Sequence, residues 1–112
     1  MNEIQEIIQK IVNFRDDRDW EQFHKSKNLA IAISIEAAEL NELFLWKTDA
    51  ESELVDQDKL KEELADVLIY SLLLSHRHGL DVKGIILEKV EINSRKYPIS
   101  KSKGSIKKYN ID

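Results

Sequence analysis

Residues 27–46, KNLAIAISIEAAELNELFLW, decide the fold, because this stretch contains neither proline nor glycine and is apolar around nearly its whole helical circumference. A helix that is apolar all round is typical of a buried position rather than of a surface helix with one apolar stripe. We therefore predict a central helix over 27–46. Ser26 should be its N-cap, since a serine side chain accepts a hydrogen bond from the first helical turn.

Two further helices flank the central one in the sequence. Residues 2–17 place apolar side chains at spacings of three and four, which predicts an amphipathic helix. Residues 59–78 are again apolar on most faces, with Asp56 or Asp58 as N-cap and Gly79 as the residue that ends the helix.

The remainder of the chain contains one more helix and two polar segments. Asp81 should cap a helix over 82–96, which Pro98 stops because a residue before proline avoids the helical region. The acidic connection 47–58 has room for one helical turn, and the basic tail 99–112 is expected to be extended.

These four helices and their short links predict an all-α, up-and-down four-helix bundle that occupies residues 1–112 as a single domain. Its two most apolar helices carry more apolar surface than two flanking helices can cover. We therefore expect self-association into a homodimer or a homotetramer. A monomeric bundle with an unusually apolar core is the alternative.

Composition restricts the classes of function. The chain has no cysteine, which excludes a disulfide framework, a thiolate zinc site and a thiol nucleophile, and makes the cytoplasm the default location. Its beginning lacks the pattern of a signal peptide, and no apolar run approaches the roughly 18 residues of a membrane span.

The net charge of −4 conceals an acidic body and a basic tail. Residues 95–112 hold six basic residues and one acid, so this tail carries +5 and the rest of the chain −9. The tail could contact nucleic acid, but an acidic body repels a long polyanion, so a compact phosphate ligand is the better match.

Two pairs of acids stand out in the most apolar helices. Glu36 and Glu39 interrupt the apolar stretch 27–46 three residues apart, and Glu63 and Asp66 repeat this spacing in the helix over 59–78. Side chains three residues apart share a helix face, so two antiparallel helices can bring all four carboxylates to one point. A buried carboxylate must be paired, protonated or bound to a cation.

Oxygen ligands without cysteine favour Mg²⁺, Mn²⁺ or Ca²⁺ over zinc. We expect Mg²⁺, with Mn²⁺ as a possible substitute, because Mg²⁺ shares its coordination with substrate phosphates. An acid cluster paired with basic groups and simple exposure are the alternatives, although residues 28–46 contain no basic residue. A di-iron bundle is disfavoured because its ExxH pattern occurs only once, at 21–24. No glycine-rich phosphate loop is present.

The pattern ExxE, a 23-residue interval and ExxD resembles the signature of the MazG-like all-α nucleoside triphosphate pyrophosphohydrolases. A similarity to the dCTP pyrophosphatase branch of that family extends over residues 15–109, and these segments carry it: RDWEQFHKSKNLAIAISIEAAELNELFLWK, EELADVLIYSLLL, NSRKYP and KGSIKKY. The resemblance implies that the four acids bind Mg²⁺ and that a metal-activated water splits the bond between the α and β phosphates of a nucleotide.

The same resemblance implies nucleotide contacts at Trp20, His24, Trp46 and Tyr70. Packing is the alternative for the two tryptophans, and a surface or capping position is the alternative for His24. Candidates for triphosphate contacts lie near the end of the fourth helix and in the tail, at Asn93, Arg95, Lys96, Lys103, Lys107 and Lys108. For the tail lysines, a solvated basic end is the favoured interpretation.

The leading hypothesis from the sequence is therefore a Mg²⁺-dependent pyrophosphohydrolase of (deoxy)nucleoside triphosphates that prefers dCTP or a modified dCTP and serves in nucleotide pool sanitation. A non-enzymatic acidic helical bundle that mediates assembly is the rival. A nucleic-acid adaptor that uses the basic tail would show steeply salt-dependent binding, and is the third class. No membrane and no long nucleic acid is expected among the partners.

Overall fold

The computed structural model of the chain describes residues 1–106, and every regular element in that part is a helix, which confirms the all-α prediction. The chain divides into two compact units, Met1–Leu80 and a second that begins at Asp81, and each is described by itself. The elements are α1 (Glu3–Asp17), η1 (Glu21–Phe23, a 3₁₀ turn), α2 (Ser26–Glu42), α3 (Asp49–Ser52), α4 (Gln57–Arg77), α5 (Val82–Lys96) and α6 (Ile99–Ser102).

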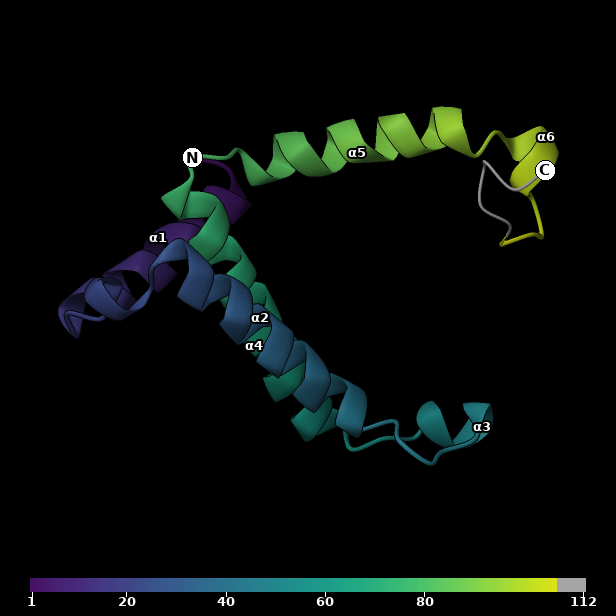
Figure 1. The fold of residues 1–112 in the computed structure, drawn as a ribbon, viewed down its shortest axis with the longest axis horizontal. Helices are drawn as coiled ribbons and strands as arrows, with labels where there is room; N and C mark the ends of the chain where they lie inside the picture. The colour runs from purple at the N-terminus through teal and green to yellow at the C-terminus, as the bar shows by residue number, and fades with distance from the viewer. Residues whose placement is uncertain (107–112) are drawn as a thin grey trace. The chain divides into compact units, whose positions relative to one another are not determined.

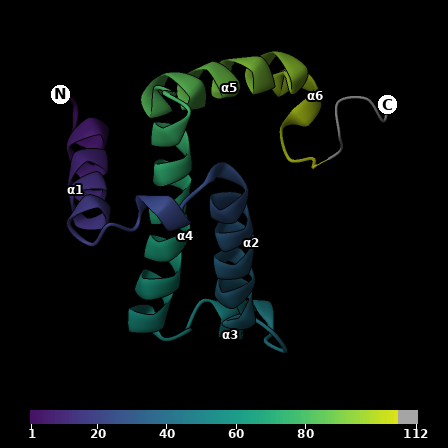
Figure 2. The ribbon, with the colours of Figure 1, turned by 60° about the vertical axis from the view of Figure 1, so that its left-hand side comes forward.

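The first unit is built on an antiparallel pair, α2 and α4, which lie side by side in both ribbon views (Figures 1 and 2). A contact of 2.8 Å between Ser26 Oγ and His78 Nε2 joins the beginning of α2 to the end of α4. Helix α1 packs on the pair through a small core of Val12, Leu29 and Leu73, of which Leu29 is only 2% exposed. This packing fixes the faces that α1, α2 and α4 turn toward one another.

Helix α2 differs from its prediction at both ends. It stops at Glu42 rather than at residue 46, because the backbone N–H groups of Leu43 and Phe44 bond to carbonyls three residues back and tighten the last turn. Trp46 then adopts a left-handed φ of 63°. Ser26 is not the N-cap: Lys25 holds that position, and the Ser26 hydroxyl bonds to His78 instead.

The α3–α4 region follows the prediction closely. Thr48 and Glu51 form a reciprocal capping box around the single turn α3, as expected for the acidic connection. Asp56 caps α4 by accepting from the Asp58 N–H at 3.0 Å, and Gly79, at a φ of 63°, follows the last turn. Helix α4 therefore places Glu63 and Asp66 along its middle.

In the second unit, α5 has the predicted bounds, but the Asp81 side chain makes no capping hydrogen bond. The prediction of an extended tail is wrong for residues 99–102. There Pro98 is the N-cap of α6, and its carbonyl accepts from the backbone N–H groups of Lys101 and Ser102. Lys107 and Lys108 lie outside the described residues.

The single chain leaves much of its apolar surface uncovered. Leu29 is the one residue of α2 that the described part of the chain buries, while Ile35 and Leu68 are each about half exposed. No helix among residues 1–106 combines the length and apolar character needed to cross a membrane. The prediction of a helix buried all round is thus not met within one copy, and self-association stays a prediction.

Candidate functional site

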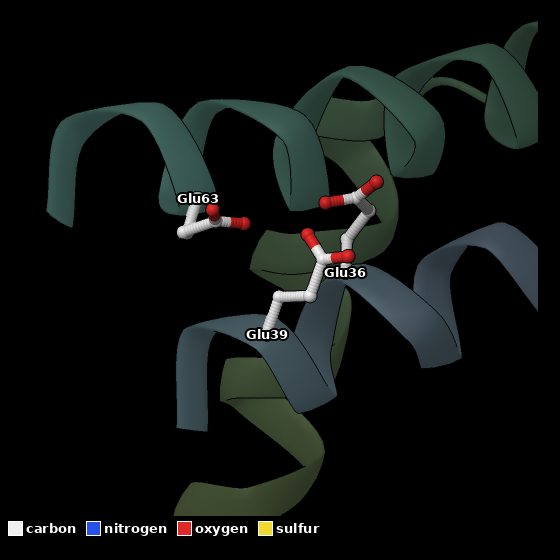
Figure 3. Close-up of side chains that lie close together, drawn as sticks. All are labelled: Glu36, Glu39 and Glu63. Atoms are coloured by element: carbon white, nitrogen blue, oxygen red, sulfur yellow. The ribbon is translucent and has the colours of Figure 1, made fainter. Parts of the chain in front are cut away.

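Three carboxylates meet across the α2–α4 pair. Glu36 and Glu39 lie one turn apart on α2 and point toward Glu63 on α4 (Figure 3). One oxygen of each residue lies within 4.8 Å of the others. The antiparallel packing and the three-residue spacing together produce this cluster, which contains three of the four carboxylates that the sequence predicts at one point.

The cluster holds negative charge that the described residues do not neutralise. Glu36 Oε2 and Glu63 Oε2 are buried without a hydrogen-bond partner, and no basic side chain among residues 1–106 forms an ion pair with these acids. Burial, followed by a side-chain hydrogen bond to Glu39 and the charge of Glu39, raises the pKa of Glu36 to about 7. Burial and Glu39 also raise the pKa of Glu63. A bound cation would satisfy both buried oxygens and stabilise the charged forms.

Asp66 stands next to this cluster but is not one of its three members. Its charge raises the pKa values of Glu36 and Glu63, after larger effects of burial and Glu39, so it lies close to both. Its side chain lines a neighbouring hollow instead. Its role as a fourth metal ligand remains a prediction.

That hollow has a volume of about 270 Å³ and is mainly apolar. Three aromatic contacts run along it in edge-to-face geometry, with ring centroids of Phe14–Trp20 at 5.7 Å, Trp20–His24 at 6.5 Å and His24–Tyr70 at 6.1 Å. Its lining comes from α1, η1 and its flanking residues, and α4: Ile11, Phe14, Arg15, Trp20, His24, Asp66, Ile69, Tyr70 and Leu73. A flat ring seated here would have aromatic walls and Asp66 at its border with the carboxylates.

The polar groups of the hollow are poised for hydrogen bonding rather than for charge pairing. Burial and the nearby Arg15 guanidinium lower the pKa of His24, which favours the neutral imidazole at pH 7. His24 Nδ1 is buried and has no hydrogen-bond partner within residues 1–106. Burial also raises the pKa of Tyr70, so its hydroxyl stays protonated.

The structure gathers some of the predicted nucleotide contacts and leaves others apart. Trp20, His24 and Tyr70 line the hollow. Trp46 does not line it, and its side chain is 99% exposed after the end of α2. The predicted phosphate contacts on α5, Asn93, Arg95 and Lys96, belong to the second unit.

Five residues of the hollow were not predicted from the sequence as site residues: Ile11, Phe14, Arg15, Ile69 and Leu73. All five lie within the helices predicted over 2–17 and 59–78. The signal that could have found Arg15 is its spacing of four from Ile11, which places it on the inward face of α1.

Three comparisons with known proteins show which proteins this chain is similar to. A solved pyrophosphatase from Archaeoglobus fulgidus superposes with a TM-score of 0.83 at 39% identity, over 88% of this chain and 94% of that one. The curated dCTP pyrophosphatases 1 of Rattus norvegicus and Homo sapiens are each 40% identical over 95% of this chain, which spans 65% of their length. The model of the MazG-like family matches residues 31–110. With its acid pairs on α2 and α4 and this match over most of its length, the chain belongs to the MazG-like family.

Proposed function

We propose that this protein hydrolyses a (deoxy)nucleoside triphosphate to the nucleoside monophosphate and pyrophosphate in a Mg²⁺-dependent reaction, with dCTP or a modified dCTP as the preferred substrate. The observation that carries the proposal is the cluster of Glu36, Glu39 and Glu63, with two buried oxygens left without partners, beside an aromatic hollow. The relatives named dCTP pyrophosphatase 1 support the choice of substrate.

The donor set of this cluster fits Mg²⁺. Only carboxylate oxygens converge there, and oxygen ligands favour Mg²⁺ or Mn²⁺ over zinc. Glu36, Glu39 and Glu63 would hold the ion, with Asp66 as a fourth ligand from the same side of α4. When bound, the metal would neutralise the triphosphate and lower the pKa of the attacking water.

The other residues of the site bind and orient the nucleotide. Trp20 and Tyr70 offer aromatic faces for the base, where stacking contributes about 1–3 kcal/mol per base. His24 presents its unpartnered Nδ1 to the same space. A carboxylate of the cluster takes the proton of the water as the phosphoanhydride bond breaks. The base therefore enters the hollow and the phosphates face the acids.

Residues that do not line the hollow complete the proposal. Trp46, Asn93 and Lys96 contact the nucleotide, and the protein acts as a homodimer or homotetramer in the cytoplasm, where it removes unwanted nucleotides from the pool. The half-exposed apolar residues of α2 and α4 support self-association. Light scattering coupled to size-exclusion chromatography measures the assembly, and a monomer at micromolar concentration would contradict this part.

The reaction is tested by measuring pyrophosphate release from eight (d)NTPs, with Mg²⁺ and with EDTA. The Glu36→Gln variant removes a charge from the cluster, and Glu42→Gln, at the exposed end of the same helix, is the matched control. We expect release only with Mg²⁺, a loss of at least about 100-fold in Glu36→Gln, and an unchanged rate in Glu42→Gln. Release from none of the nucleotides, with both variants folded, would favour the non-enzymatic assembly module instead.

A further inference from the structure

Arg15 is the charged side chain that the described part of the chain buries, with 8% of its surface exposed. Its Nε donates to Asp16 Oδ1 at 2.9 Å. Within residues 1–106 neither of its terminal nitrogens, Nη1 and Nη2, makes a hydrogen bond. These terminal donors are therefore available to a ligand that enters the aromatic hollow, which Arg15 lines.

The surroundings of Arg15 indicate what that ligand is. Arg15 lines the aromatic hollow and is the one basic group there that stays charged, because the pKa of His24 is lowered. The walls of Phe14, Trp20 and Tyr70 suit a flat ring, and the guanidinium supplies a rigid fork of N–H donors. Such a fork binds two adjacent acceptor atoms in one plane.

We infer that Arg15 is a specificity-determining residue, which selects cytosine by donating two hydrogen bonds to its adjacent acceptors O2 and N3. This inference rests on the proposed function, since it assigns the base-binding end of that site. Uracil and thymine carry a hydrogen on N3, so the fork meets one acceptor and one opposing donor. A site that leaves a buried donor unpaired rejects such a ligand.

A second hollow beside Arg15 offers a competing explanation for its terminal N–H donors, which make no hydrogen bond within residues 1–106. Arg15 also borders a polar hollow of about 350 Å³ that Glu21, His76 and Arg77 complete. There Arg77 Nη1 lies 3.9 Å from Glu21 Oε1, so this hollow has its own partly paired cation. If Arg15 served only an anion in this second hollow, its removal would leave base discrimination unchanged.

The test measures binding, so that it stands apart from catalysis. Calorimetry with Mg²⁺ gives the Kd values of the non-hydrolysable α,β-imido analogues of dCTP and dUTP for the wild type, Arg15→Met, Arg15→Lys and the control Arg77→Met. A bidentate pair provides about 5- to 140-fold discrimination, which corresponds to about 1–3 kcal/mol at 1.4 kcal/mol per tenfold change. We expect the wild type and Arg77→Met to prefer the dCTP analogue by such a factor.

In Arg15→Met the preference should fall to within about twofold, through weaker binding of the dCTP analogue, and Arg15→Lys should recover it only in part. Equal weakening of both analogues in Arg15→Met, or an undiminished preference, would overturn the inference. Should Arg15→Met not fold, an undiminished preference in Arg15→Lys would overturn it equally. Binding of these analogues, together with no pyrophosphate release from any of the eight hydrolysable (d)NTPs, would refute the proposed reaction alone, whereas no binding of either analogue would refute both.

Discussion

Replacing Leu29 with alanine removes the most buried side chain of the described structure, which is 2% exposed between Val12 and Leu73. The change deletes three carbon atoms, worth about 2.4 kcal/mol at about 0.8 kcal/mol for each buried methylene group. A cavity between three helices adds to this loss because the helices relax only partly. We expect the free energy of unfolding to fall by about 3 kcal/mol, and the melting temperature by about 12 °C.

Differential scanning calorimetry and guanidinium titration measure this change, with all proteins at one concentration because assembly affects apparent stability. Leu54→Ala is the matched control, since it makes the same chemical change at a side chain that is 84% exposed. The control should change stability by less than about 0.5 kcal/mol. A loss below about 1 kcal/mol for Leu29→Ala would refute the assignment of the core, and with it the packing that aligns the acids.

The remaining predictions concern charge, the base and a helix cap. In the metal-free protein, the pKa of Glu36 is about 7 against an ordinary value of 4.5, so the folded chain holds a proton that the unfolded chain has released between these two pH values. The free energy of unfolding should therefore decrease as the pH rises from about 4.5 to about 7, and Mg²⁺ should stabilise the protein more at pH 8 than at pH 5.5. Thermal melts with EDTA or Mg²⁺ test both statements, and an equally steep decrease in Glu36→Gln would show that another group is responsible. Trp20→Ala should raise the KM for dCTP by about 5- to 140-fold through lost stacking, and steady-state kinetics with an unaltered KM would place the base elsewhere. Thr48→Ala should lower the free energy of unfolding by about 1 kcal/mol by removing the cap of α3, and a neutral result in chemical denaturation would mean that this turn adds nothing to global stability.

The helices that the sequence located best are those whose ends carry strong local signals. Asp56 and Gly79 bracket α4, and both act as predicted. The end of α2 was predicted four residues too late. Glycine is the usual residue with a left-handed φ after a helix, but here Trp46 adopts that φ and no glycine marks the end. The turn at α6 was missed because proline marks the beginning of a helix as readily as its end.

The acid pairs were predictable because a carboxylate in an apolar helix is costly to bury without a partner or a cation. This holds whichever helices pack around it. The aromatic hollow was predictable only in part, since it depends on how α1 packs against α4. Arg15 shows the difference: it lies within the helix predicted over 2–17, but only tertiary packing buries it near His24. Hydrophobic periodicity identifies the apolar face of a helix, but it does not show which other side chains the neighbouring helices will bury.

The central claim is that the carboxylate cluster serves the hydrolysis of a triphosphate between its α and β phosphates. Phosphorus NMR of dCTP incubated with the wild-type protein and Mg²⁺ tests this most directly, because it identifies both products at once. The account predicts dCMP and pyrophosphate in equal amounts, and no turnover when EDTA replaces Mg²⁺. Formation of dCDP and inorganic phosphate, or turnover that persists in EDTA, would contradict it.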